Sequence, residues 1–325
     1  MKKAALVLVF CCIFWGYSFP VMQLAMTQLR GQFALRQGAL PTVAQNVGLS
    51  AAFLGWRFGL ATLCSLVLLK SARQKYSSDD LRIGALLGVL FGVGMLHQLA
   101  GLQYTLPSAS SFLTSLGVIF TPVAQALIFR RAVHGWTWAG VGLALIGAAI
   151  LALPNPDACA SCTIMETPPI RYLGEYLTAS SAVFFSAQTL ALDRFGSRCN
   201  PERMTVAMFA TAALIFLALS AGLCGRSLYN EEILKTLAGD VKFSLFLLSL
   251  TLLSSVLAIN LMNRYQKYVS PAVASVIYSN ESVFATGFSC AIFFTEKLTW
   301  TTALGGALIL AALAAVTLPK SEATE

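Results

Sequence analysis

The most constraining feature of this 325-residue sequence is a succession of apolar runs that contain few charged residues. A run of about 20 apolar residues is long enough to cross a bilayer as an α-helix. Strands of a membrane β-barrel are shorter and alternate polar with apolar residues, which these runs do not. The pattern predicts an all-α polytopic membrane protein with ten transmembrane helices. We place them at residues 4–26, 51–70, 81–104, 107–129, 134–153, 172–192, 202–224, 242–262, 269–294 and 299–318.

Composition supports a bilayer as the solvent. The chain is 57% hydrophobic and 11% charged, against about 25% charged residues in a typical soluble domain. The net charge of +8 does not indicate nucleic acid, because the basic residues lie between the apolar runs and form no continuous patch. The first apolar run follows Lys2 and Lys3 but lacks a small-residue cleavage site, so we expect a retained helix and not a removed signal peptide.

The distribution of Lys and Arg predicts the orientation. If both termini are cytoplasmic, fourteen of the 22 basic residues fall on the inner side, seven on the outer side, and Arg57 lies inside a helix. This bias follows the positive-inside rule. The outer side then carries the long loops, at 27–50, 154–175 and 225–240. Cys159 and Cys162 lie in the second of these loops, where a disulfide and two free thiols both remain open.

An internal repeat organises the chain. A gapless shift of 164 residues places identical residues of the fourth and fifth helices on the ninth and tenth. The matched pairs include Tyr104 and Tyr268, Pro107 and Pro271, Ser111 and Ser275, Ser115 and Ser279, and Trp136 and Trp300. Five helices separate the copies, and five is odd, so the copies are expected to cross the membrane in opposite senses. Such inverted repeats are typical of secondary transporters, whose site lies near the midplane between the halves.

The same shift isolates polar residues that occur in one half only. Glu281 falls opposite Gly117, Asn280 opposite Leu116, and Glu296 opposite Ala132. The second half thus has polar groups where the first half has none. We take this asymmetry as an indication of a functional site.

Several segments resemble the EamA family of the drug/metabolite transporter superfamily. They are "IFWGYSFPVMQLA", "FLGWRFGLATL", "LAGLQYTLPSASSFLTSLGVIFTPV" and "YVSPAVASVIYSNESVFATGFSCAIFFTEKLTW". The resemblance covers essentially the whole chain. It implies two five-helix modules, at 1–154 and 172–319, with an outer loop at 155–171 and a cytoplasmic tail at 320–325. It also implies a prokaryotic transporter of the cytoplasmic membrane, commonly an exporter of amino acids or other small metabolites.

The sequence departs from the usual family pattern in three places. The common Glu-Pro of the ninth helix appears here as Glu281-Ser282, and the first copy ends in Arg130-Arg131-Ala132 without an acidic turn. The loop after the first helix is also longer than usual. These departures bear on substrate contacts more than on the fold.

Glu281 and Arg57 are the charged residues that lie well inside predicted helices. A charge at this depth costs a few kcal/mol, so it faces the bundle interior, pairs, or is neutralised. For Glu281, a proton carrier, a counter-charge for a cationic group of the substrate, and a structural ion pair with Arg57 all remain open. For Arg57, outward snorkelling and binding of a substrate carboxylate are further alternatives.

Other residues are candidates for lining the site. In the family architecture the first, third, fourth, sixth, eighth and ninth helices surround a central cavity. Amides in membranes often only hydrogen-bond between helices, and aromatic rings more often pack than bind. With Glu281 and Arg57, the candidate substrate-binding or coupling residues are Asn280, Tyr278, Gln98, Gln188, Asn260, Trp15, Phe112 and Ser115.

The function predicted is a secondary transporter that moves a small metabolite across the cytoplasmic membrane by alternating access. An importer or a sugar-conjugate transporter is the alternative within the superfamily, and a polytopic enzyme or scaffold is the alternative outside it. Two observations argue against an enzyme. The sequence has only two histidines, His97 and His134, and no group of acid-base or metal-binding residues falls at one depth in the membrane. We expect no cofactor and no metal. The expected partners are the substrate and the bilayer, with proton coupling and a homodimer left open.

Overall fold

The computed structural model describes residues 2–151, 172–229 and 231–317. Every apolar run chosen from the sequence is helical there. The helices are α1 (Lys2–Gln37), α2 (Val43–Leu68), α3 (Ser78–Leu102), α4 (Pro107–Thr114), α5 (Gly117–Leu127), α6 (Gly135–Leu151), α7 (Leu173–Phe195), α8 (Pro201–Cys224), α9 (Glu231–Gly239), α10 (Val241–Ser249), the π-helix η5 (Leu250–Leu257), α11 (Ala258–Tyr265), α12 (Pro271–Tyr278), α13 (Asn280–Ala291) and α14 (Trp300–Thr317). Short 3₁₀ turns occupy Ser71–Arg73, Gly196–Arg198, Gly225–Ser227 and Gln266–Tyr268.

Seven helical stretches of the described chain are long and apolar enough to cross a membrane. They are α1, α2, α3, α4–α5, α8, the stretch Val241–Tyr268 and α14. Helix α6 is apolar but shorter, and α7 and α12–α13 are not among the seven. The helical membrane architecture is therefore confirmed, and the number of ten crossings stays a prediction.

Two of the predicted outer loops contain more helix than we expected. Helix α1 continues to Gln37 because Arg30 and Phe33 on its protein-facing side are buried. Helix α2 then begins after a capping box, in which the Thr42 hydroxyl accepts from the Gln45 N–H and the Gln45 side chain accepts from the Thr42 N–H. The loop predicted at 27–50 is therefore wrong in its extent.

The loop predicted at 225–240 contains the amphipathic helix α9, with Ile233 and Leu237 buried. The predicted loop at 154–175, which includes Cys159 and Cys162, lies almost entirely outside the described residues.

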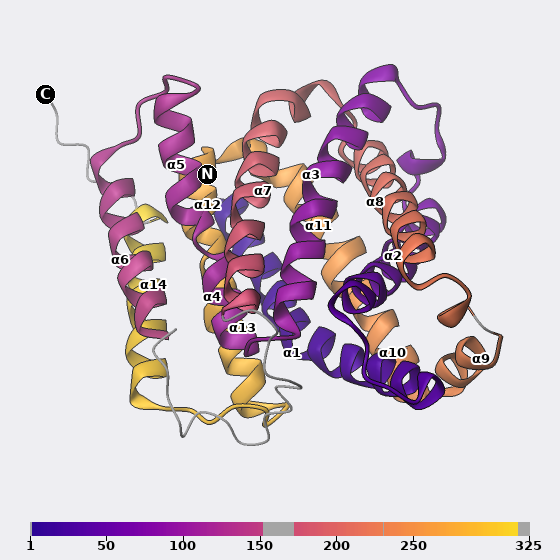
Figure 1. Cartoon of the computed structure of the whole chain (residues 1–325). Helices are drawn as coiled ribbons and strands as arrows, with labels where there is room; N and C mark the ends of the chain where they lie inside the picture. Colours follow the sequence, from indigo (N-terminus) through magenta and orange to yellow (C-terminus); the bar gives the residue numbers. More distant parts are fainter. Residues whose placement is uncertain (1, 152–171, 230, 318–325) are drawn as a thin grey trace, which may run out of the picture.

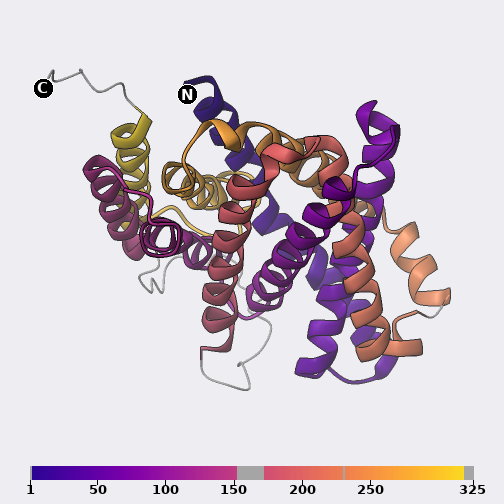
Figure 2. The same cartoon turned by 90° about the horizontal axis from the view of Figure 1, so that it is seen from above.

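Several helices pack along one another in pairs. Helix α2 lies along α8, α6 lies along α14, and α3 packs on both α7 and α8. Figures 1 and 2 place the α6–α14 pair at one end of the molecule and the α2–α8 pair at the other. Glycines allow the close approach of α3 to α8, since a Cβ on Gly84 would lie 2.6 Å from the Ala207 Cβ.

Two of the central helices are interrupted at equivalent positions. The breaks lie between α4 and α5, at Ser115–Leu116, and between α12 and α13, at Ser279. Under the shift of 164 residues, α4 coincides with α12 at both ends, and the last residue of α5 coincides with the last residue of α13. In Figure 1, α4 lies below α5 whereas α12 lies above α13, so the two broken helices run in opposite directions.

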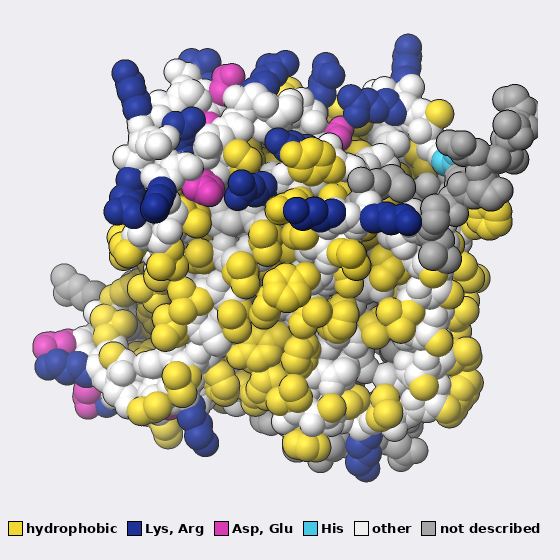
Figure 3. All heavy atoms as spheres, turned by 180° about the vertical axis from the view of Figure 1, so that it is seen from behind, with side chains coloured by type: hydrophobic (Ala, Val, Ile, Leu, Met, Phe, Trp, Pro, Cys, Tyr) yellow, Lys and Arg dark blue, Asp and Glu magenta, His cyan; other side chains and the backbone are white. Residues whose placement is uncertain are grey.

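The surface carries a broad hydrophobic belt. Figure 3 shows hydrophobic side chains across the middle of one face and Lys and Arg side chains gathered along its upper edge. The start of α1 and the end of α14 both lie toward this upper side in Figure 1. A belt of this kind matches the hydrocarbon layer of a bilayer.

Candidate functional site

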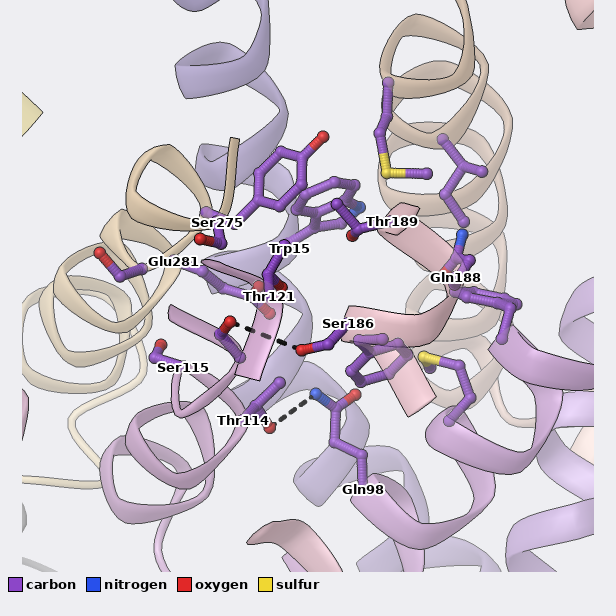
Figure 4. Close-up of a pocket in the computed structure, with 18 of the residues that line it drawn as sticks. Trp15, Gln98, Thr114, Ser115, Thr121, Ser186, Gln188, Thr189, Ser275 and Glu281 are labelled. Carbon is purple, nitrogen blue, oxygen red and sulfur yellow. Dashed lines mark hydrogen bonds between the residues drawn. The ribbon is translucent and has the colours of Figure 1, made fainter. Parts of the chain in front are cut away.

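A cavity of about 820 Å³, open solvent included, lies among the central helices (Figure 4). The lining comes from α1, α2, α3, α7, η5, α11 and both interrupted helices. Residues on each side of both breaks reach it: Thr114, Ser115 and Gly117 in the first half, and Tyr278, Ser279 and Glu281 in the second. The cavity thus lies where the two interruptions meet.

Seven of the ten candidate residues line this cavity. They are Glu281, Arg57, Tyr278, Gln98, Gln188, Trp15 and Ser115. They come from six different stretches of the sequence, so the fold brings together residues whose proximity the sequence could only suggest.

The other three candidates do not line the cavity. Asn280 is fully buried, and its amide donates to the carbonyls of Val276 and Ile277 in the preceding turn. Asn260 donates to the Val256 carbonyl at 2.7 Å, and Phe112 packs in an apolar cluster with Ala148 and Ile309. The two asparagines therefore hydrogen-bond within their own helical segment, and Phe112 packs against apolar neighbours.

Glu281 lies in the first turn of α13, directly after the break, and is half-buried. In the described part of the chain, no hydrogen bond or ion pair reaches its carboxylate. A helix N-terminus favours negative charge, because the free N–H groups and the helix dipole point toward it. This position explains how the carboxylate is tolerated while it remains free to meet a ligand in the cavity.

Arg57 is 2% exposed and is held by neutral groups. Its Nε donates to the Ser255 hydroxyl and its Nη2 to the Ser254 hydroxyl, both at 2.9 Å, and its Nη1 contacts the Met22 sulfur at 3.3 Å. Its guanidinium also lies 5.2 Å from the ring centre of Phe58. Arg57 therefore does not snorkel to solvent, and it forms no ion pair with Glu281 in this structure.

The remaining polar candidates use only part of their hydrogen-bonding capacity within the protein. Gln98 donates to the Thr114 hydroxyl at 3.1 Å (Figure 4). The Gln188 amide nitrogen is buried and has no hydrogen-bond partner among the described residues. Ser115 shares a 2.6 Å hydrogen bond with Ser282, which ties the first break to α13.

The aromatic candidates pack on each other at the cavity wall. The rings of Trp15 and Tyr278 meet edge to face, with centroids 5.4 Å apart, and the Tyr278 hydroxyl donates to Gln266 at 2.8 Å. This contact fixes the orientation of both rings toward the cavity.

Sequence reasoning missed most of the hydroxyl groups of the lining. They are Ser18, Thr114, Thr121, Ser186, Thr189, Ser254, Ser275 and Ser279. Hydroxyls are common in apolar helices and usually bond to a carbonyl of the preceding turn, as Ser186 does with Ala182. Only Ser275 and Ser279 carried a signal, because the internal repeat matches them to Ser111 and Ser115.

Comparison with known proteins gives a consistent result. The model of the EamA-like transporter family matches residues 38–153 and 172–318. An uncharacterized transporter from Archaeoglobus fulgidus is 28% identical over 315 residues, which cover 97% of this chain and 86% of that protein. A solved structure described only as a crystal structure of a protein shares the fold, with a TM-score of 0.62, 17% identity and coverage of 98% of this chain and 97% of that one. The chain is a membrane transporter and belongs to the EamA-like family of the drug/metabolite transporter superfamily.

Proposed function

We propose that this protein is a secondary transporter that carries a small metabolite, an amino acid or a similar compound, out of the cell by alternating access. The observation that carries the proposal is the cavity at the two helix breaks, which Glu281 and Arg57 both line. Helices that are interrupted at a site near the membrane midplane are a recurring feature of secondary transporters.

The two halves supply the symmetry that alternating access needs. The bounds of α4 and α5 recur in α12 and α13 to within one residue, and the two broken helices run in opposite directions. These observations support ten crossings arranged as two inverted five-helix repeats. Such halves can exchange their arrangements about a fixed site, which opens the cavity to each side in turn.

The distribution of charge supports cytoplasmic termini. The Lys and Arg side chains in Figure 3 gather along the edge toward which the start of α1 and the end of α14 lie, as the positive-inside rule expects of a cytoplasmic face. Labelling of single cysteines introduced near each end, with a membrane-impermeant thiol reagent on intact cells, tests this orientation. Labelling before lysis would contradict it.

Glu281 has two roles that the site can support. As a proton carrier, it would couple transport to a pH gradient by binding and releasing a proton in the cavity. As a counter-charge, it would hold a cationic or amino group of the substrate. Both roles require a carboxylate that is not committed to a protein partner, as found here.

Transport assays in proteoliposomes separate these roles. A metabolite panel is tested for counterflow and for uptake driven by an imposed pH gradient. If Glu281 carries the proton, Glu281→Gln abolishes gradient-driven uptake and retains counterflow. If it contacts the substrate, both fall by at least about tenfold, as expected when a charged hydrogen bond is lost.

The matched control is Glu231→Gln, the same chemical change at an exposed position of α9. It is expected to transport like the wild type. If Glu281→Gln transports like the wild type at every pH, Glu281 has neither role. If no metabolite exchanges in either direction, the transport proposal itself fails.

A further inference from the structure

The guanidinium of Arg57 is a buried positive charge without a negative partner among the residues that the structure describes. Its three contacts, the hydroxyls of Ser254 and Ser255 and the sulfur of Met22, are all neutral. The ion pairs found among the described residues involve other arginines and lysines. Neutral partners satisfy N–H groups but do not cancel a charge, and an uncompensated charge in a membrane protein is costly.

The guanidinium is also not fully used as a donor. Arginine carries more N–H groups than its three partners accept. Arg57 lines the cavity, so a molecule bound there would lie beside a guanidinium that has N–H groups left to donate. A negatively charged group of that molecule would supply the missing counter-charge.

The π-helix η5 adds a second donor beside Arg57. Ser254 and Ser255 are consecutive, yet both hydroxyls bind the same guanidinium, which the wider turn of Leu250–Leu257 accommodates. Each hydroxyl accepts from Arg57 and donates in no hydrogen bond of the described residues. Of the two, only Ser254 lines the cavity, so its O–H proton is free to meet an acceptor there.

The charge of the whole cavity selects the kind of anion. Arg57 and Glu281 are the charged residues of the lining, one of each sign. A phosphate dianion would bring two negative charges to a single guanidinium with Glu281 in the same space. A carboxylate brings one charge, and its planar pair of oxygens matches the guanidinium fork.

We propose that Arg57 and Ser254 form a subsite that binds a carboxylate group of the transported molecule. This inference rests on the proposed function of the cavity as the transport site. It assigns Arg57 to the ligand and not to Glu281, and it disfavours phosphorylated sugars as substrates.

Ligand protection of the purified, detergent-solubilised protein tests the subsite. The probes are straight-chain and amino-substituted monocarboxylates, their amides, and alkyl phosphates of the same chain length. The readouts are the midpoint of thermal unfolding and the tryptophan fluorescence, to which Trp15 contributes from the cavity wall. We expect at least one carboxylate to bind about tenfold or more tightly than its amide, since charge-assisted hydrogen bonds are the stronger ones.

Variants then locate the effect. Arg57→Gln is expected to abolish the preference for carboxylate over amide. Ser254→Ala and Ser255→Ala form a matched pair, because both residues bind Arg57 at 2.9 Å and only Ser254 lines the cavity. Ser254→Ala is expected to weaken carboxylate binding severalfold, and Ser255→Ala to leave it close to the wild-type value. The serine pair keeps the test decisive if Arg57→Gln does not fold.

Four results would overturn the proposal. One is equal binding of carboxylates and amides, or no binding of either. Another is an equal effect of the two serine variants. The third is recovery of stability in Arg57→Gln/Glu281→Gln relative to either single variant, which would show that Arg57 serves Glu281. Transport of the panel without carboxylate preference would reject the subsite and leave the transport function standing.

Discussion

The interrupted helices of the two halves begin at equivalent positions, yet residues at non-equivalent positions cap them. The Ser108 N–H at the start of α4 donates to Glu296 at 3.0 Å, and the Ala272 N–H at the start of α12 donates to Gln125 at 3.0 Å. Ser108 and Ala272 match under the shift of 164 residues, whereas Gln125 matches Ser289. The two halves therefore share the need for a cap and not the residue that provides it.

The caps are reciprocal. Gln125 lies on α5 of the first half and caps a helix of the second, while Glu296 follows α13 of the second half and caps a helix of the first. Figure 1 places the start of α4 and the start of α12 toward opposite ends of the molecule. One contact between the halves therefore holds the start of α4, and a second holds the start of α12.

The halves also differ in how tightly a neighbour holds the half-helix after the break. A Cβ on Gly16 of α1 would lie 2.5 Å from the Phe284 Cβ and 2.7 Å from the Ala285 backbone nitrogen. A Cβ on Gly117 of α5 would lie 3.2 Å from the Ser186 hydroxyl and 3.7 Å, an ordinary contact distance, from the Ala182 carbonyl oxygen. Helix α13 is therefore packed against backbone, and α5 against a side chain that can rotate.

The largest expected effect tests this difference in packing. Gly16→Ala should destabilise the protein by about 1–3 kcal/mol, the usual result of overpacking, because backbone cannot move aside. Gly117→Ala should change stability by less than about 1 kcal/mol, since the Ser186 rotamer can adjust. Thermal unfolding in detergent measures both.

Gly31→Ala is the control on the same helix α1, where a new Cβ meets nothing within 4 Å. It should leave stability unchanged or raise it by about 0.5–1 kcal/mol, because alanine favours the helix. If Gly16→Ala and Gly117→Ala lose the same amount of stability, the proposed difference in packing between the halves is wrong.

Removal of the caps should have the next largest effect. Glu296→Ala and Gln125→Ala each leave a buried N–H without a partner, at a cost of about 0.5–2 kcal/mol. Glu296→Gln keeps an acceptor and makes the two caps chemically alike, so it should retain most of the stability. If Glu296→Ala and Glu296→Gln unfold at the same temperature, the cap does not stabilise α4.

A pH series sharpens the comparison between a charged cap and a neutral one. Glu296 lies in the turn between α13 and α14, where burial raises the pKa of its carboxyl above the usual range. A carboxyl whose pKa is higher in the folded state destabilises the fold as the pH rises from the unfolded-state pKa through the folded-state pKa.

The stability of the wild type relative to Glu296→Gln should therefore fall as the pH rises from about 4. Unfolding temperatures of the two proteins across the pH range give this difference directly. Glu231→Gln, at an exposed carboxyl, serves as the control. If the stability of the wild type relative to Glu296→Gln rose with pH, the pKa of Glu296 would not be raised in the folded state.

The smallest expected effect concerns the end of the first interrupted helix. Where the second half has Glu296, the first half has Arg131 and Ala132, and Arg131 pairs with Asp193 at 2.7 Å on a partly exposed surface. Such pairs contribute about 0–1 kcal/mol. Asp193→Asn should therefore shift the unfolding temperature only slightly, and less at high salt. If Asp193→Asn lost as much stability as Gln125→Ala, the Arg131–Asp193 pair would be an important structural contact.

Much of the helical layout could be predicted from the sequence, because apolar length is a property of each segment alone. The extension of α1 to Gln37 could not, since burial of Arg30 depends on neighbouring helices. The repeat placed Ser115 and Ser279 in one register, but nothing local indicated that the helices break there.

The site was predictable in part for similar reasons. Glu281 and Arg57 stood out because charges are rare in apolar helices, whereas the hydroxyls of the lining resembled ordinary helix serines. Asn260 and Asn280 were misjudged as lining residues because an amide bonded to its own helix has the same sequence context as one in a cavity. Glu296 did mark an asymmetry between the halves, and in the structure it is a helix cap.

The reciprocal caps have a consequence for how such a chain could arise. A polypeptide with only the first copy would begin α4 with a buried N–H that lacks Glu296, and one with only the second copy would begin α12 without Gln125. Each copy could complete its interrupted helix only against a companion. A chain with a single copy would therefore need a companion chain to supply this contact, as each half of the present chain does for the other.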